Sequence, residues 1–266
     1  MLPSVLHLVL PGAALVCSMM FILWIIHLRI RNASIVDPGW AFGLPLVAVT
    51  YALLGHGYAQ RKWLAAGMAV LWGVRLGVHL LVRIVGQPEE GRYQELRRQW
   101  KTQLPLKFLI FFEFQALLDL FLSLPFLLAA LNPAPTLSAF EYAGIALWLI
   151  ALAGEAVADA QLAAFKRDPS SHGQVCQRGL WNYSRHPNYF FEWLGWLAYP
   201  VIAIRIADPW TWAALVGPVV MFAVLMVGTG VPPLEQAMLR SKGEAYRRYQ
   251  AKVSLFFPRP PKEIAP

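Results

Sequence analysis

Charged side chains are scarce in this chain, and that scarcity excludes most classes of soluble protein. Only 14% of the 266 residues are Asp, Glu, Lys or Arg, whereas 58% are hydrophobic, and long windows carry no charge. Such windows are typical of membrane helices, which need about 20 apolar residues per crossing. We therefore expect an all-α, polytopic membrane protein with seven transmembrane helices, near residues 4–28, 39–59, 63–82, 107–131, 138–162, 188–205 and 209–231.

Several other signals are missing as well. Cysteine is nearly absent, with Cys17 in an expected span and Cys176 in a polar loop, which argues against a disulfide or a cysteine-based zinc site. The first span lacks a basic leader and a small-x-small cleavage site, so we interpret it as a retained helix. No internal repeat or extended linker divides the chain, which predicts one domain over 1–266. No nucleic-acid-binding motif accompanies the net charge of +8, and membrane topology suffices to explain that charge.

The distribution of positive charge predicts the orientation in the membrane. If the seven spans alternate, nineteen of the 23 Lys and Arg residues lie on one face, while Arg61, Lys62 and Arg205 lie on the other. Basic connections favour the cytoplasm. We therefore expect the N-terminus outside and the C-terminus in the cytoplasm, together with the long connections 83–106, 163–187 and 232–266.

Ionisable residues inside the expected spans are costly at bilayer depth unless they face a cavity or a partner. Glu155 and Asp159 are spaced i,i+4 and therefore share a helix face, as do Arg75 and His79, which Arg83 extends by a turn. One interpretation is a structural network of ion pairs. The other is a polar cavity that opens to the cytoplasm. A transporter could also use such charges, but the chain shows no internal pseudo-symmetry.

The densest chemistry lies where a polar loop meets the sixth span, in the run from Arg178 to Glu192. Pro187 fits the first turn of a helix, where backbone N–H groups favour an anion, and the arginines of the run could add charge-assisted bonds to a phosphate. Glu192 falls one turn after Asn188, so an amide and a carboxylate project together. This pair suits a nicotinamide carboxamide or an adenosine better than a lipid. For Trp181, Tyr183 and Tyr189, an interfacial aromatic belt is an equally good explanation.

Motifs in and around this run resemble those of a known family. The run R-G-L-W-x-Y-S-R-H-P-N-Y-x-x-E, with Asp159-x-Gln161 before it and Gly243-Glu244-x-Tyr246-x-x-Tyr249 after it, resembles the bacterial membrane-bound steroid 5α-reductase family, of the C-terminal domain type that is also described as a domain of unknown function (DUF1295-like). Asp37-Pro38-Gly39-Trp40 and Arg92-Tyr93 also look like family features, and the signature region covers about 138–260.

The resemblance implies a seven-helix reductase of a bacterial inner membrane, with its active site open to the cytoplasm. Such an enzyme would use NADPH to reduce an activated C=C bond, such as the 4-ene of a 3-oxosteroid or of a related lipophilic enone. The resemblance also implies that Asp37 and a tyrosine, for which we select Tyr93, are catalytic; a turn at Asp37-Pro38 explains that motif equally well. Lys166 stands where animal enzymes carry arginine, which leaves NADPH versus NADH open. With the cationic face of the third span, the expected cofactor-binding residues are Arg75, Arg83, Glu155, Asp159, Lys166, Arg178, Tyr183, Arg185, His186, Asn188, Glu192 and Glu235.

A membrane methyltransferase of the isoprenylcysteine carboxyl or phospholipid type is the alternative, because such enzymes carry a similar R-H-P-x-Y stretch and use S-adenosylmethionine. The expected partners are a lipophilic small-molecule substrate and membrane lipid, without nucleic acid, a metal ion or a protein partner. A non-enzymatic scaffold would have no need for the cluster from Arg178 to Glu192.

Overall fold

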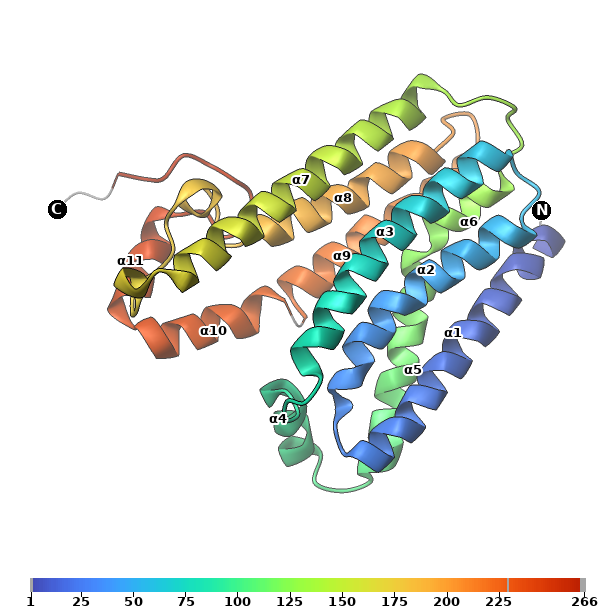
Figure 1. Ribbon diagram of the computed structural model, residues 1–266. Coiled ribbons are helices and arrows are strands. Elements are labelled where there is room, and N and C mark those ends of the chain that lie inside the picture. Colours follow the sequence, from blue (N-terminus) through green and yellow to red (C-terminus); the bar gives the residue numbers. More distant parts are fainter. Residues whose placement is uncertain (1, 229, 264–266) are drawn as a thin grey trace. The chain divides into compact units, whose positions relative to one another are not determined.

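The computed structural model describes residues 2–228 and 230–263, which fold almost entirely into helices (Figure 1). Helices account for 79% of the chain, and no strand occurs among the described residues. The chain forms two compact units, each made of two segments that are separate in sequence. Unit 1 comprises Met1–Ser138 and Ile202–Gly217, and unit 2 comprises Ala139–Val201 and Pro218–Pro266. The expectation of a single domain stays a prediction.

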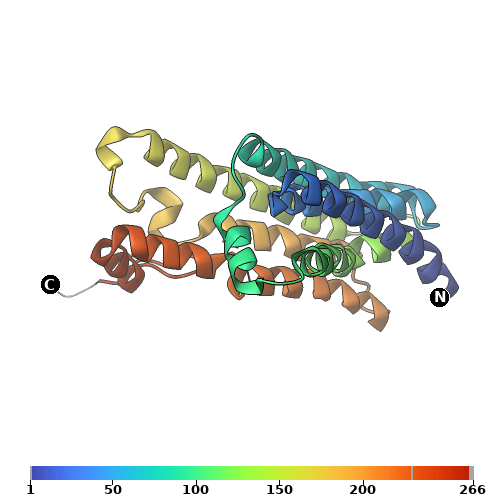
Figure 2. The same cartoon turned by 90° about the horizontal axis from the view of Figure 1, so that it is seen from below.

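Unit 1 is a bundle of apolar helices in which α1, α2 and α3 lie side by side (Figures 1 and 2). Helices α2 and α3 approach closely because Gly73 lacks a side chain: a Cβ there would lie 2.2 Å from the Pro45 ring and 2.6 Å from the Ala41 carbonyl oxygen. The elements of unit 1 are α1 (Leu2–Ile30), η1 (Ala33–Ile35), α2 (Val36–Leu54), α3 (Ala59–Ile84), α4 (Gly91–Trp100), α5 (Leu104–Leu122), α6 (Leu124–Leu131) and η4 (Pro209–Leu215).

A bend of 41° separates α5 from α6. Pro125 lies in the first turn of α6, where its missing N–H removes a hydrogen bond that would continue α5. Carbonyl groups at the end of α5 are left without helical partners, and Ser123 Oγ donates to one of them, the Leu120 carbonyl, at 2.8 Å. The chain therefore continues as two helices whose axes differ by 41°.

The two ends of unit 1 differ in chemistry. At one end, the C-termini of α1 and α3 meet α4 and the start of α5, and the cations between residues 29 and 107 gather there, except Arg61, Lys62 and Arg75. At the opposite end, the Arg61 guanidinium is buried and donates to the carbonyls of Asn132, Ala134 and Thr136. Within this unit, most of the basic connections therefore lie at the end that carries α4.

Unit 2 consists of two long helices and a group of short elements at one of their ends. Its elements are α7 (Ala139–Arg167), η2 (Pro169–Ser171), η3 (Gly179–Asn182), α8 (Pro187–Ala203), α9 (Val216–Met226, from Pro218 onward), α10 (Val231–Lys242) and α11 (Glu244–Lys252). Helix α7 contacts α8 where Gly154 faces the Phe191 ring, since a Cβ on Gly154 would lie 2.3 Å from that ring. The loop from Asp168 to Arg178 lies near α10 and α11 (Figure 2).

The C-terminal segment is fixed in unit 2 by aromatic packing. Phe256 and Phe257 contact the rings of Phe190 and Trp193 on α8 and of Phe222 on α9, with centroids 5.4–6.4 Å apart. These large rings bury apolar area in specific edge-to-face arrangements. The C-terminal segment is thereby held against the beginning of α8, which belongs to the polar run from Arg178 to Glu192.

Five helical segments in the described part of the chain are long and apolar enough to cross a membrane, or six if the bent α5–α6 pair counts as one span. The protein is thus helical and membrane-spanning as expected, but the count of seven is not confirmed. The remaining expected span, 188–205, corresponds to α8, which has 17 residues. The orientation across the membrane stays a prediction.

Candidate functional site

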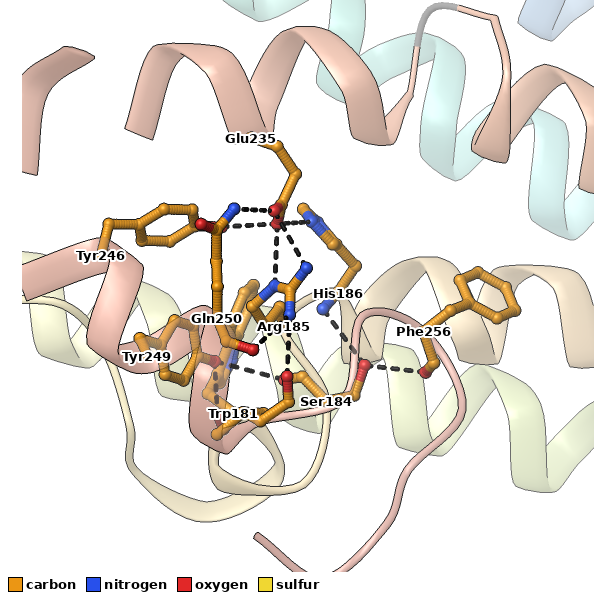
Figure 3. Close-up of polar contacts among 10 residues, drawn as sticks. Trp181, Ser184, Arg185, His186, Glu235, Tyr246, Tyr249, Gln250 and Phe256 are labelled. Carbon is orange, nitrogen blue, oxygen red and sulfur yellow. Dashed lines mark hydrogen bonds and ion pairs between the residues drawn. The ribbon is translucent and has the colours of Figure 1, made fainter. Parts of the chain in front are cut away.

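The carboxylate of Glu235 is the centre of a hydrogen-bond network in unit 2 (Figure 3). Arg185 donates to both of its oxygens, through Nε and Nη2, each at 3.0 Å. His186 Nε2 lies 2.8 Å from Oε1, the Tyr246 hydroxyl donates to Oε1 at 2.7 Å, and Gln250 Nε2 donates to Oε2 at 2.6 Å. One carboxylate therefore connects the start of α8 with α10 and α11.

The remaining donors of Arg185 hold the backbone of the C-terminal segment. Its Nη1 donates to the carbonyls of Gln250 and Val253, at 3.2 and 2.8 Å, and its backbone N–H donates to the Ser254 carbonyl at 2.8 Å. The side chain is only 11% exposed. Its charge is compensated by Glu235, so Arg185 positions the wall of the site.

Two neighbouring hydroxyls complete this structure (Figure 3). Ser184 Oγ donates to the Phe256 carbonyl at 2.8 Å, and the Tyr249 hydroxyl donates to the Trp181 carbonyl at 2.5 Å. Burial is the main cause that raises the pKa of Tyr249 above its ordinary value, and the nearby Tyr246 raises it further. Burial and the bond to Glu235 likewise raise the pKa of Tyr246. Both phenols therefore remain donors at neutral pH.

A cavity of about 330 Å³ adjoins this network in unit 2. Three cationic side chains line it, from Lys166, Arg185 and Lys242, whereas none of the described residues that line it is Asp or Glu. The other lining residues are aromatic, apolar or neutral polar: Leu162, Phe165, Ser171, His172, Gly173, Gln174, Val175, Cys176, Trp181, His186, Asn188, Leu234, Met238, Tyr246 and Tyr249. A cavity with excess positive charge and aromatic faces favours an anionic ligand that carries a flat ring.

The structure brings some of the expected cofactor-binding residues to this cavity and places others around it. Lys166, Arg185, His186 and Asn188 line the cavity, and Glu235 anchors two of them. Asp159 accepts a hydrogen bond from Asn188 Nδ2 at 3.1 Å. The i,i+4 spacing of Asp159 and Glu155 is thus realised on α7.

Six expected residues have other surroundings. Glu192 accepts a hydrogen bond from Trp196 Nε1 at 3.0 Å, so its carboxylate is engaged one turn further along α8. Arg178 pairs with the exposed Asp168 at 3.3 Å and stacks over the Phe165 ring. Tyr183 is 45% exposed, and Glu155 lies on α7. Arg75 and Arg83 belong to unit 1, where Arg83 pairs with Glu90.

Lys242 and His172 also line the cavity, and sequence reasoning did not select either of them. Lys242 is the last residue of α10 and was one of several cations in a long connection that is expected in the cytoplasm. Its position could not be told from that of Arg240, two residues earlier. Only the packing of α10 against the loop after α7 identifies it.

A second polar cluster lies in unit 1, where α4 meets the start of α2. The Tyr93 hydroxyl donates to Asp37 Oδ1 at 2.6 Å, and the Arg92 guanidinium pairs with Oδ2 of the same carboxylate. Arg92 also pairs with Glu90 at 3.2 Å, and the Glu90 N–H donates to Ser34 Oγ at 2.9 Å. Both expected catalytic residues therefore touch each other, although they are 56 residues apart in the sequence.

The chemistry of this cluster follows from burial. Tyr93 is 2% exposed, and burial, together with the charge of Asp37, raises the pKa of its phenol well above the ordinary value. Asp37 lies in the first turn of α2, where the helix dipole stabilises a carboxylate. The arrangement keeps a proton on Tyr93 and holds the phenol in one orientation. Such a group can donate a hydrogen bond to a developing oxyanion.

Residues 23–253 match the model of a family described as a protein of unknown function (DUF1295). The chain belongs to this family. Members of the DUF1295 family are related to membrane enzymes of the steroid 5α-reductase-like type. The resemblance noted from the sequence is thereby confirmed at the level of the family, while the bacterial origin is not confirmed.

The match extends to a eukaryotic relative. An uncharacterized protein of Schizosaccharomyces pombe is 27% identical to this DUF1295 protein over 273 aligned positions, which cover 90% of this chain and 76% of the yeast protein. No solved structure matches the chain significantly. The family relationship therefore covers both units, and the chemistry has to be argued from their residues.

Proposed function

We propose that the protein is a membrane reductase that uses NADPH to reduce an activated C=C bond of a lipophilic enone, such as the 4-ene of a 3-oxosteroid. The observation that carries this proposal is the charge of the cavity in unit 2. Glu235 compensates Arg185, but the two other cations of the lining, Lys166 and Lys242, have no carboxylate beside them among the described lining residues. This composition suits the phosphates of a dinucleotide.

The residues present fit such a cofactor. Lys166 and Lys242 would pair with phosphate groups, whereas Trp181 and Tyr246 provide ring faces for a flat base. Asn188 has an amide that can hydrogen-bond a carboxamide, with Asp159 orienting it from α7. When bound, NADPH would supply a hydride to the β-carbon of the enone.

The carbonyl end of the substrate requires a different group. As the β-carbon accepts hydride, the C=C electron pair moves toward the carbonyl oxygen, where negative charge develops. The Tyr93 O–H, which donates to Asp37 in the structure, would turn to donate to that oxygen, while Arg92 would keep its pair with Asp37. A proton from the surrounding solvent then completes the α-carbon, so the product gains one hydride and one proton.

S-adenosylmethionine provides the sharpest contrast, because it carries a sulfonium cation and no phosphate. The proposal is tested by the thermal stabilisation that NADPH, NADH and S-adenosylmethionine each confer on the purified protein in mild detergent, since a ligand that binds only the native state raises its stability. We expect stabilisation by NADPH. Stabilisation by S-adenosylmethionine alone would replace the reductase by the methyltransferase.

A matched pair of variants on α10 makes the test specific to the cavity. Lys242→Gln should weaken NADPH binding about tenfold or more, because it removes one charge-assisted phosphate contact. Arg240→Gln, which removes an exposed cation from the same helix, should leave NADPH binding unchanged. Equal affinities of the two variants would remove Lys242 from the cofactor site.

A further inference from the structure

A small pocket in unit 1, apart from both polar clusters described above, has the features of an anion site. It measures about 60 Å³ and is formed where the end of α1 and the start of α5 meet α4. His27 and Leu28 from α1, Arg31 directly after α1, Arg97 from α4, and Leu104, Pro105 and Phe108 from α5 line it. Two arginines thus face a space that can hold a phosphate-sized group.

The histidine shows that a hydrogen-bond acceptor is missing from this pocket. His27 is 2% exposed, and its Nε2 lies 2.9 Å from Arg97 Nη2. Because a guanidinium can only donate, Nε2 must accept, and the ring proton therefore resides on Nδ1. The Trp24 carbonyl of the same helix faces this buried Nδ1 but does not form a regular hydrogen bond with it. A buried donor without a regular hydrogen bond is costly, and an anionic oxygen in the pocket would satisfy it.

The arginines retain donors for such a ligand. Arg97 uses Nε and Nη2 for Glu89, at 2.7 and 3.0 Å, and stacks on the Phe108 ring, whereas its Nη1 makes no hydrogen bond within the described residues. Arg31 is exposed, and its side chain has no hydrogen bond or ion pair with any residue that the structure describes. Glu89 is the acidic group nearest to the arginines, and Arg97 neutralises it.

The backbone adds to this environment. Helix α5 has 19 residues and begins at Leu104, so the N–H groups of its first turn have no partners within the helix. Leu104 and Pro105 line the pocket, which places the positive end of the helix dipole there. Trp24 Nε1 donates to the Pro105 carbonyl at 2.9 Å and thereby ties α1 to the start of α5.

The position along the helices identifies the source of the anion. α1 is a candidate membrane span that ends at Ile30, and α5 begins the bent pair that can form another, so the pocket lies at the end of the apolar region. Leu28 and Leu106, next to the pocket, are 38% and 51% exposed, which offers a surface for acyl chains. Basic pockets between membrane helices are where anionic headgroups bind.

We propose that this pocket binds the headgroup phosphate of an anionic phospholipid, with Arg31, Arg97 and the Nδ1 donor of His27 as its ligands. The lipid joins α1, α4 and α5 and so stabilises the end of unit 1 that carries Asp37 and Tyr93. The inference does not depend on the reductase proposal, since no residue of the cavity in unit 2 takes part.

The test compares lipids on the purified full chain in detergent. Thermal unfolding is followed during titration with phosphatidylglycerol, with phosphatidylcholine and with inorganic phosphate. We expect phosphatidylglycerol to raise Tm more than phosphatidylcholine and more than phosphate alone. Equal effects of the two lipids would overturn the proposal. An equal effect of inorganic phosphate would show an ion site and would overturn the assignment to lipid.

Two arginine variants locate the effect. Arg31→Gln, an exposed change that should not disturb folding, is expected to weaken phosphatidylglycerol binding about tenfold. Arg98→Gln removes a cation of α4 that pairs only with Glu95 among the described residues and does not line the pocket, so binding should remain unchanged. Native mass spectrometry then counts the retained lipids. An unaltered affinity of Arg31→Gln would place the lipid elsewhere.

Discussion

At the scale of single residues, the two polar clusters differ in what their carboxylates do. Glu235 accepts hydrogen bonds from four side chains and organises backbone from three segments, so its main effect is on stability. Asp37 accepts from one phenol and one guanidinium, and the phenol has a single proton, which it would redirect from Asp37 to a ligand oxygen. We therefore assign structural work to the first cluster and chemistry to the second.

Replacement of Glu235 should destabilise unit 2 strongly. Glu235→Ala leaves the Arg185 guanidinium, only 11% exposed, without its counter-ion, and loss of one partner of a buried ion pair costs about 3–5 kcal/mol. The measurement is the apparent Tm in detergent. Glu244→Ala is the matched control, because its pair with Arg247 is exposed and 3.8 Å long. A Tm as high as that of Glu244→Ala would show that the network contributes little.

Removal of the Tyr93 hydroxyl should impair enone reduction while cofactor binding persists. Tyr93→Phe and Asp37→Asn are expected to lower kcat about 10²-fold or more, because each disturbs the donor at the carbonyl oxygen. The raised pKa of Tyr93 means that the phenol keeps its proton as pH rises past its ordinary value, so no loss of activity from its ionisation is expected near pH 10. NADPH oxidation in the presence of an enone measures both. Wild-type turnover of Tyr93→Phe would exclude its catalytic role.

At the scale of elements, α4 is the piece that assembles the cluster in unit 1. It is a short, arginine-rich helix whose Tyr93 is buried, while Arg98 remains exposed. Arg92 and Tyr93 hold it against the start of α2, and Arg97 holds it against α1. The position of α4 in turn depends on the close packing of α2 and α3, to which it is connected.

Two glycines of α3 should respond oppositely to the same change. Gly73→Ala places a Cβ against Pro45 and the Ala41 carbonyl, neither of which can rotate away, and should lower stability by about 1–3 kcal/mol. Gly67→Ala meets nothing within 4 Å and should raise stability by roughly 0.5–1 kcal/mol. Thermal melts of both variants in one detergent provide the comparison. Equal shifts would contradict the close contact of α2 with α3.

At the scale of the whole molecule, the orientation in the membrane decides which solutes reach each connection. The basic connections are expected in the cytoplasm, where a soluble dinucleotide is available. In a cysteine-free background, Thr136→Cys should react with a membrane-impermeant maleimide in intact cells, and Gln177→Cys should react only after permeabilisation. Both positions are exposed. The reverse pattern would invert the orientation and would move the proposed cofactor site away from the cytoplasm.

The sequence by itself determined the helical membrane class, because apolar windows and the period of a helix are local properties that can be read along the chain. It also indicated where chemistry concentrates, from Arg178 to Glu192, since polar residues at a membrane boundary are costly without a function or a partner. The seven-span count rested on apolar windows and on the distribution of positive charge, and the structure supports five or six candidates.

Only the tertiary structure decided which of these residues meet. Tyr93 reaches Asp37 across 56 positions, Glu235 reaches Arg185 across 50, and Lys242 reaches the cavity where Arg240 does not. Local periodicity specifies which face of a helix is apolar, but not which helix covers it. These partners were set by helix packing, for which steric fit, such as the missing side chain of Gly73, is the physical reason.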